Sequence, residues 1–414
     1  MTGVQTCALP ISGSSLARGI ELAERGVACG AAGRDLGRLR YLQTEAYAIC
    51  FELACCAAPG AEAMGLLERG SGEWFGTVGA LMVSYALRGD REHASPLLAE
   101  LLATEPQPGA IMSCMVGYCW TMMTLAFSGK YADVAELFPR AARLQARLAP
   151  DDRTIEALVA LSRWWAACCE DQPWHRLVLA QRGAALCEEA GTSVWGTRGY
   201  ADLGVSLLGL GAYDDAERAL MRGLEIADRT GGMHATTFLK LHLGATLVDR
   251  ERLDEAEALL IDVQDTCGRA GDVYYAGRAH TYLARLLAKR GALEAAERQA
   301  RRATERCHVR PIRAYANAVL SDLLVAQGRS ADALGAALEA RRLFDALGGV
   351  SEGDTLIHLV VAHALTVAAH PDAGQARRAA RERLTARAAT IDDPARRASF
   401  LAIDDSVRTL ALLP

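Results

Sequence analysis

A helix-turn-helix unit of about forty residues recurs along this chain, and it constrains the fold more than any other feature of the sequence. The stretch Leu241-His-Leu-Gly-Ala-Thr-Leu-Val is followed by Leu253-Asp-Glu-Ala256. One unit later, Tyr282-Leu-Ala-Arg-Leu-Leu is followed by Leu293-Glu-Ala-Ala296. A single helix pair cannot bury its apolar face, so the units must stack against their neighbours. We therefore expect an all-α fold, an α-solenoid of antiparallel helix pairs.

Equivalent positions in successive units carry the same type of side chain. Small residues fill one column of the first helix, at Gly204, Gly244, Ala284 and Ser321. Alanine recurs early in each second helix, at Ala216, Ala256, Ala296 and Ala333. Small residues allow two helix backbones to approach closely, while neighbouring leucines fill the space beside the crossing. Turns between the helices of a unit are predicted at Gly89, Gly129, Glu170, Gly211, Glu251, Gly291 and Gly328.

These columns resemble the tetratricopeptide repeat, in which a Leu-Gly pair is followed by an aromatic residue or leucine and later by alanine. The match is good from about 193 to 347 and weaker from 73 to 192. The unit is longer than that repeat, and its usual early tryptophan is replaced by Tyr200, Lys240, His280 or Asn317. Longer units of this kind are similar to the helical region of bacterial MalT-like transcription regulators and signalling ATPases. The resemblance implies a right-handed superhelix whose first helices line a concave inner face.

The C-terminal segment carries a second resemblance. Ile391-Asp-Asp-Pro-Ala-Arg-Arg-Ala-Ser-Phe-Leu401 and Arg408-Thr-Leu-Ala-Leu412 look like the closing segment of large bacterial serine/threonine kinase–AAA ATPase signalling proteins. Between these parts that family has a Val-Pro-Glu-Asn-like stretch, where this chain has Ile403-Asp-Asp-Ser-Val407. The resemblance implies the C-terminal interaction region of a multidomain signalling regulator, with a kinase or ATPase domain upstream.

The first residues agree with that expectation. Met1–Ile11 resembles, codon by codon, the translation of a common sequencing adapter, so we expect residues 1–11 to be an artefactual leader on a fragment. A signal peptide fits less well, because the segment has no basic start and no continuous apolar run. The rest is predicted to divide into degenerate helical repeats (12–192), clear tetratricopeptide-like repeats (193–347), and a last repeat with a C-terminal capping helix (348–414).

Composition and charge narrow the classes of function. The 414 residues are 51% hydrophobic, as expected of a folded chain, and the net charge of −5 lacks the basic excess of a nucleic-acid binder. The 12 cysteines form no C-x-x-C pair, which indicates free thiols in a reducing, cytoplasmic compartment. Residues 106–129 are uncharged and long enough to span a bilayer, but Gly129 falls in the repeat register. We therefore expect a buried solenoid helix there, and neither a membrane nor a nucleic-acid partner.

No set of residues indicates catalysis, a cofactor or a metal site. The chain has no glycine-rich phosphate loop, no His-Arg-Asp and no Asp-Phe-Gly. His358 and His363 are spaced i, i+5, whereas helical zinc-binding pairs are spaced i, i+4 and accompanied by a glutamate. Acidic pairs such as Asp392–Asp393 fall at predicted helix starts, where they stabilise the N-terminus. We expect no enzyme activity and no cofactor in this chain.

The predicted inner face supplies the candidate binding site. Mapping the repeat columns onto the first helices places six residues there: Arg198, Phe238, Arg278, Arg285, Tyr315 and Asp322. Arginines and aromatics together suit recognition of acidic or extended peptides, although these positions are also compatible with ordinary packing. The expected partner is a protein or peptide, or an upstream domain of the parent protein. The alternative is a small-ligand sensor of a transcriptional regulator, with a pocket near Trp164, Trp165, Trp174 and Trp195.

Overall fold

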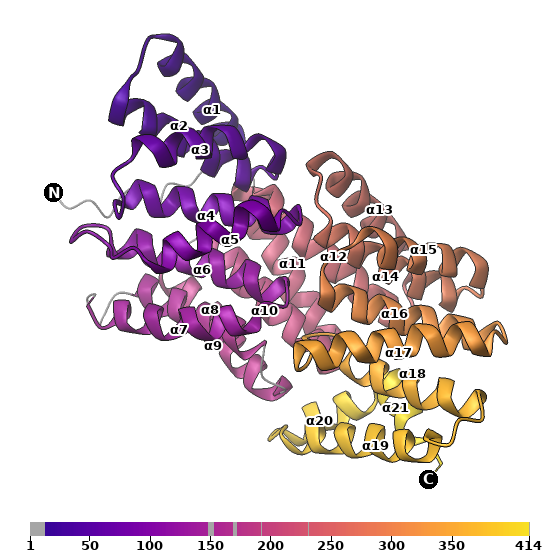
Figure 1. The fold of residues 1–414 in the computed structure, drawn as a ribbon. Helices are drawn as coiled ribbons and strands as arrows, with labels where there is room; N and C mark the ends of the chain where they lie inside the picture. The colour runs from indigo at the N-terminus through magenta and orange to yellow at the C-terminus, as the bar shows by residue number, and fades with distance from the viewer. Residues whose placement is uncertain (1–12, 148–152, 169–171, 192, 231, 414) are drawn as a thin grey trace.

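The computed structural model of the chain describes residues 13–147, 153–168, 172–191, 193–230 and 232–413. In these ranges the chain forms helices and no strand, and the helix pairs follow one another as a solenoid (Figure 1). The predicted all-α solenoid of antiparallel helix pairs is confirmed. The predicted leader, 1–11, lies outside the described residues.

The helices have the following bounds. The first unit and the degenerate repeats comprise α1 Gly13–Ala28, α2 Gly33–Ile49, the 3-10 helix η2 Leu53–Cys55, α3 Ala57–Leu66, α4 Gly72–Leu87, α5 Arg91–Leu102, α6 Ile111–Phe127, α7 Tyr131–Gln145, α8 Arg153–Ala167 and α9 Pro173–Glu189. The clear repeats comprise α10 Ser193–Gly209, α11 Tyr213–Thr230, α12 Met233–Asp249, α13 Leu253–Ala270, α14 Tyr274–Lys289, α15 Leu293–Arg306, α16 Arg310–Ala326 and α17 Ser330–Leu347. The C-terminal part comprises α18 Asp354–Val367, α19 Ala373–Ala389, α20 Pro394–Leu401 and α21 Asp404–Leu410.

Most units join their two helices through a residue with a left-handed backbone. The φ angle lies between 69° and 76° at five predicted turn positions: Gly89, Gly129, Gly211, Gly291 and Gly328. Glycine adopts this conformation without steric cost, and Glu251 adopts it at φ 61°. The predicted turn at Glu170 lies outside the described residues.

The first helices of the pairs form the inner layer of the solenoid. Neighbours in the series α4, α6, α8, α10, α12, α14, α16 and α18 contact one another, while the second helices pack on the outer side. The alanine column lies at the crossing within each pair, where Ala216, Ala256, Ala296 and Ala333 are fully buried. A larger side chain would separate these helices, which explains why the sequence repeats a small one.

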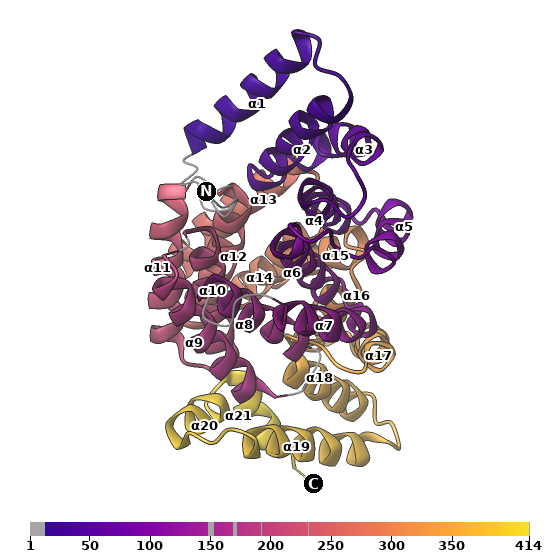
Figure 2. The same cartoon turned by 90° about the vertical axis from the view of Figure 1, so that its left-hand side faces the viewer.

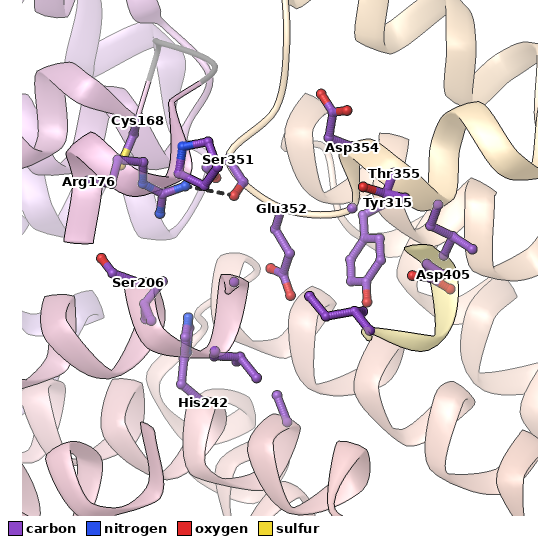
Figure 3. A pocket seen from close by; sticks show the side chains of 18 of the residues that line it. Cys168, Arg176, Ser206, His242, Tyr315, Ser351, Glu352, Asp354, Thr355 and Asp405 are labelled. Atoms are coloured by element: carbon purple, nitrogen blue, oxygen red, sulfur yellow. Dashed lines mark hydrogen bonds between the residues drawn. The ribbon is translucent and has the colours of Figure 1, made fainter. Parts of the chain in front are cut away.

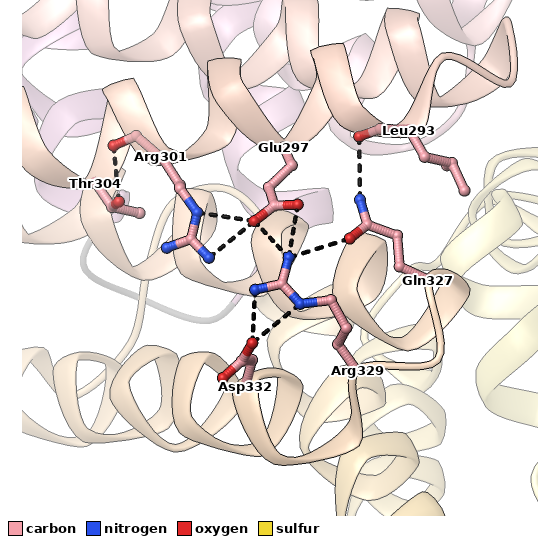
Figure 4. A network of polar contacts seen from close by, with 7 residues as sticks. All are labelled: Leu293, Glu297, Arg301, Thr304, Gln327, Arg329 and Asp332. Atoms are coloured by element: carbon pink, nitrogen blue, oxygen red, sulfur yellow. Dashed lines mark hydrogen bonds and ion pairs between the residues drawn. The ribbon is translucent and has the colours of Figure 1, made fainter.

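A column of glutamates joins adjacent units on the outer side. Glu297 on α15 accepts hydrogen bonds from Arg301 on the same helix and from Arg329 in the following unit, each at 2.8 Å (Figure 4). Glu217 and Glu257 occupy the equivalent positions of the two preceding units, and each also pairs with an arginine at the turn of the following unit, Arg250 and Arg290. Exposed ion pairs stabilise a fold by only about 0.2–1 kcal/mol each, so the column fixes the register between units more than it holds them together.

The superhelix is wound so tightly that its successive turns touch. The turn after α4 lies against the start of α14, where the Val273 N–H donates to Leu87 O at 3.0 Å. The turn after α6 lies against the start of α16, and a Cβ on Gly129 would lie 2.7 Å from Pro311 Cγ. These contacts connect units that are far apart in the sequence.

The C-terminal helices make a contact of the same kind. Gly211, in the turn after α10, approaches the end of α20, and a Cβ there would lie 2.6 Å from Ser399 O. Asp215 on α11 pairs with Arg396, which is 181 residues later in the chain. A separate apolar cluster covers this junction, and Figure 2 shows α20 and α21 beside α9. The superhelix is therefore closed on itself at both ends of the clear repeats.

Closure fills much of the interior with the chain's own side chains. Phe127 on α6 stacks on Phe238 of α12 and on Tyr274 of α14, with ring centroids 5.7 and 5.1 Å apart. Phe51, which follows α2, stacks on Tyr275 at 5.8 Å. Because these rings come from early and late units, the inner face is largely buried and is not an open concave groove.

Two predictions for single segments are confirmed. The uncharged segment 106–129 contains α6, most of whose residues are buried. None of the helices in the described ranges is long and apolar enough to cross a membrane. The closing helix is α20, where the Asp393 side chain accepts a hydrogen bond from the Arg396 N–H at 2.9 Å and Pro394 lies in the first turn. A further short helix, α21, was not predicted from the sequence.

The close helix crossing predicts opposite effects of two Gly→Ala substitutions. At Gly204 on α10 a Cβ would lie 2.5 Å from Leu220 Cγ, and Leu220 is fully buried. We expect Gly204→Ala to reduce the free energy of unfolding by about 1–3 kcal/mol, as overpacking does. At Gly268 on α13 a Cβ meets nothing within 4 Å, so Gly268→Ala should be neutral or stabilise by up to about 1 kcal/mol. Urea denaturation followed by circular dichroism measures both, and equal effects would contradict close packing at Gly204.

The closed interior also predicts a pH dependence of stability. Burial, assisted by the charge of Arg198, lowers the pKa of His234 to about 3, and its Nε2 lies 3.0 Å from the Tyr275 hydroxyl. The unfolded imidazole takes up a proton near pH 6.5 but the folded one does not, so this histidine costs stability as the pH falls below 6.5, by about 1.4 kcal/mol per pH unit. His234→Gln keeps a polar partner for Tyr275 and should remove about 2 kcal/mol of the wild-type loss between pH 7.5 and 5.

Chemical denaturation at the two pH values tests this expectation. His370→Gln serves as the control, because the side chain of His370 is 42% exposed. An unchanged pH dependence in His234→Gln would show that His234 is protonated equally in the folded and unfolded chain.

Candidate functional site

A cavity of about 150 Å³ remains inside the closed superhelix (Figure 3). The first helices from α6 to α18 line it together with α9, α19, α20 and α21, and the loop between α17 and α18 reaches its wall. The charged side chains that line it are the cations Arg176, Arg278, Arg285 and Arg387 and the acids Asp249, Glu352, Asp354 and Asp405. Four arginines and four acidic side chains thus line the cavity, whereas much of the surrounding interior is apolar.

Four of the six predicted inner-face residues line this cavity: Phe238, Arg278, Arg285 and Tyr315. Arg198 is buried nearby, with its guanidinium 4.4 Å from the ring centre of Phe238, and it pairs with Asp202. Asp322 is not among the lining residues and binds Arg408 of α21 at 2.5 Å. The repeat columns therefore bring four of the six together, and their role in binding a partner stays a prediction.

The loop between α17 and α18 reaches into the cavity. It spans 348–353, whereas the corresponding loop between α15 and α16 spans 307–309. Gly348, Gly349 and Gly353 have φ angles of 73°, 145° and 81°, which other residues rarely adopt. A Cβ on Gly353 would collide with the ring of Tyr315. The extra residues and the glycines allow the backbone to turn inward beside the inner layer.

Glu352 in this loop is held by two donors from α14. The Tyr282 hydroxyl donates to Glu352 Oε1 at 2.5 Å, and Arg278 Nη2 lies 3.1 Å from Oε2. Arg278 and Tyr282 are one helical turn apart, so their side chains leave the same face of α14. They are 8% and 1% exposed, whereas the Glu352 side chain is 27% exposed. The inner layer therefore provides a buried carboxylate-binding site, which the chain fills with its own glutamate.

The backbone of the same loop is bound by an earlier unit. Arg176 on α9 donates a hydrogen bond to the carbonyl oxygen of Ser351 at 3.0 Å, across 175 residues of sequence. Its guanidinium also lies 5.1 Å from the ring centre of Trp164. Figure 3 shows Ser351 beside Arg176, with the Glu352 side chain extending further into the cavity. Side chains of two units thus bind the main chain and the acidic side chain of one loop segment.

The other cavity acids lie on helices. Asp249 on α12 pairs with Arg285 at 2.6 Å, and Asp354 on α18 lies 3.4 Å from Arg387. Burial raises the pKa of the Asp405 carboxyl on α21 to about 6. Among the four cavity acids, Glu352 lies in a loop. The backbones of Asp249, Asp354 and Asp405 are held in helices.

His242 positions Arg278 from the opposite side. Its Nε2 lies 3.0 Å from Arg278 Nη1, and because a guanidinium can only donate, the imidazole accepts this hydrogen bond. Burial, with the charges of Arg278 and Arg198, lowers the pKa of His242 well below its usual value. The ring stacks on Phe238 at 4.3 Å. A neutral histidine fixes the arginine without neutralising it, so the counter-charge comes from Glu352.

The four tryptophans of the alternative pocket do not gather at one place. Trp164 lines the cavity and donates a hydrogen bond from Nε1 to Ser206 at 2.8 Å. Trp165 is fully buried, Trp174 packs against the C-terminal apolar cluster, and Trp195 lies 5.3 Å from Trp120. One of the four is thus found among the described lining residues, and the small-ligand alternative stays a prediction.

Three residues of this site were not identified from the sequence: Arg176, Tyr282 and Glu352. Arg176 lies on a second helix and Glu352 in a loop, and neither belongs to the repeat column used to map the inner face. The sequence does carry a signal for this loop, the glycines Gly348, Gly349 and Gly353. They mark a connection that is longer than those between the units of α12 to α17.

A second hollow, of about 610 Å³, lies where the turn after α4 meets α16 and α17. Its lining includes the basic residues Arg91, His308, Arg310, Arg313 and Arg342. Glu339 pairs with two of them, Arg342 at 2.7 Å and Arg313 at 3.7 Å. This local basic surface exists despite the net charge of −5, so the expectation that nucleic acid does not bind remains unconfirmed.

No protein-family model and no curated protein matches the chain. Solved structures of helical repeats do match. A Rap protein complexed with competence and sporulation factor has a TM-score of 0.54 at 12% identity, over 82% of this chain and 98% of that chain. A STAND ATPase with a tetratricopeptide repeat sensor, from Pyrococcus horikoshii, has a TM-score of 0.45 at 12% identity, over 86% of this chain and 56% of that chain. A human IFIT1 dimer with m7Gppp-AAAA has a TM-score of 0.44 at 12% identity, over 97% and 95%.

These similarities concern the fold. The chain shares the helical-repeat fold of the Rap protein, in agreement with the α-solenoid that its columns predicted. At 12% identity they do not test the type of parent protein or the adapter-like leader.

Proposed function

We propose that this chain is a non-catalytic binding scaffold whose inner cavity takes a short segment of a partner protein. One observation carries the proposal: the cavity already holds a loop segment of the chain itself, bound through a main-chain carbonyl by Arg176 and through a carboxylate by Arg278 and Tyr282. A site that binds main chain and an acidic side chain together has the elements of peptide recognition. The Rap protein of similar fold is complexed with competence and sporulation factor, which supports a binding role for such an array.

The size of the cavity favours a peptide over a small-molecule ligand. Small-molecule pockets usually measure about 300–1,000 Å³, and this cavity measures about 150 Å³. If the 348–353 loop leaves, the space that it now fills becomes available, and that space accommodates a short length of main chain. The ligand that best fits the space is a short peptide segment.

We also propose a cytoplasmic signalling regulator of the bacterial kinase–ATPase type as the setting. The support is the resemblance of residues 391–412 to the closing segment of such proteins. The partner segment then belongs to another protein or to another domain of the same parent. The genomic reading frame upstream of codon 12 tests this setting, because a kinase or ATPase frame that continues into Ser12 is expected.

Selection of a displayed library of random twelve-residue peptides on the full chain tests the binding function. We expect enriched peptides that lose affinity at least tenfold on Arg176→Ala, because a charge-assisted hydrogen bond of about 1.5–3 kcal/mol is removed. Arg182→Ala, on the same helix and 57% exposed, is the matched control and should leave affinity unchanged. Absence of enriched peptides, or equal affinity for wild type and Arg176→Ala, would contradict the proposed function.

A further inference from the structure

We propose that Arg278 and Tyr282 form a subsite for a glutamate side chain of a partner peptide, and that Glu352 occupies this subsite from within until the peptide displaces it. The inference rests on the proposed function. It adds the chemistry of the ligand and the means by which the same chain controls access to its own cavity.

The subsite residues Arg278 and Tyr282 are held more firmly by the fold than the loop that carries Glu352. Arg278 and Tyr282 are buried within α14, which contacts α12 and α16 on either side. In the described chain, the backbone from 349 to 352 makes one hydrogen bond, which Ser351 accepts from Arg176. Glycines flank this stretch on both sides. The loop is therefore fixed by three contacts: the Glu352 carboxylate, the Ser351 carbonyl, and the packing of Val350 against the core. Of these, the Glu352 carboxylate is the one that fills the site on α14.

Departure of Glu352 is unfavourable unless another anion replaces it. Arg278 is 8% exposed, its Nε has no hydrogen-bond partner in the described structure, and His242 offers only a neutral acceptor. A buried cation that loses its counter-charge strongly destabilises a fold. A carboxylate from outside restores the pairing, whereas a neutral side chain does not, so the subsite discriminates by charge.

The loop also indicates which residues can flank the acid. The residue after it must be glycine, because a Cβ on Gly353 would collide with the ring of Tyr315. The residue before it presents its carbonyl oxygen to Arg176. The loop sequence Val350-Ser-Glu-Gly-Asp354 is therefore a direct guide to the ligand, and we expect a Glu-Gly pair in a short peptide that turns at the glycine.

Chemical rescue tests the subsite in the full chain. Glu352→Ala removes the internal carboxylate and leaves room for a small one. We expect sodium acetate to raise the melting temperature of Glu352→Ala above its value in sodium chloride of equal ionic strength, which screens exposed charges equally. Wild type, and Glu352→Gln with its amide filling the space, report the general effect of replacing chloride by acetate, and the rise in Glu352→Ala should exceed theirs. Equal responses of Glu352→Ala to the two salts would overturn the carboxylate subsite.

A labelled peptide tests displacement. We expect fluorescein-labelled Val-Ser-Glu-Gly-Asp-amide to bind Glu352→Ala at least tenfold more tightly than wild type by fluorescence anisotropy, because the internal competitor is gone. Glu352→Gln keeps the shape of the side chain, and it should also bind more tightly than wild type. The control peptide has glutamine in place of the glutamate and should not bind. Equal affinity of the three proteins, no binding to either variant, or equal binding of the control peptide would each overturn the proposal.

The two proposals fail in different ways. In one outcome, selected peptides require Arg176 but bind Glu352→Ala no better than wild type. The proposed binding function would then stand, and the proposal that Glu352 blocks the subsite would be wrong. In the other outcome, acetate stabilises Glu352→Ala but no peptide is enriched on the wild-type chain. The carboxylate subsite would then stand, and the proposed peptide-binding function would be wrong.

Discussion

The contact between successive turns of the superhelix is the constraint on which the rest of this structure depends. In an open helical-repeat array, each unit touches only its neighbours and the first helices line an extended binding surface. In this chain the turns after α4, α6 and α10 lie on α14, α16 and α20, so the first helices face one another across a filled interior. The cavity exists where that filling is incomplete, beside the loop before α18.

Closure also determines the electrostatics of the interior. Arg198 and Arg278 would lie on an exposed face of an open array, where water would solvate them. Here both are buried, and each requires a counter-charge within the protein, because a lone buried ion is strongly unfavourable. Asp202 supplies one from the same helix as Arg198, while the counter-charge of Arg278 comes from Glu352 in a distant loop. The neutral state of His234 and His242 has the same origin, since burial next to these cations disfavours a further positive charge.

The sequence predicted the features that are decided within one unit. Gly211 marks a turn and Ala256 marks a helix crossing, because each requirement arises between two adjacent helices. The same columns placed Arg278 and Tyr315 on the inner layer. They did not predict that Gly129 meets Pro311, because no repeat column relates positions so far apart. The partner of Arg278 was missed for a related reason, since Glu352 lies in a loop, outside the helical columns. The glutamate column at Glu217, Glu257 and Glu297, by contrast, was available from the spacing alone.

Closure has a consequence for how such a chain can change in length. Solenoids whose units contact only their neighbours gain or lose a unit with little effect on the remainder. In this chain the loss of one unit between α6 and α16 would move every later helix start away from the earlier turn that it now contacts. The leucine and alanine columns would remain intact, yet the contacts between successive turns of the superhelix, which cover the interior, would be lost. The number of units is therefore a fixed structural parameter, and a chain of this fold with one repeat more or fewer would need a different set of contacts across the superhelix.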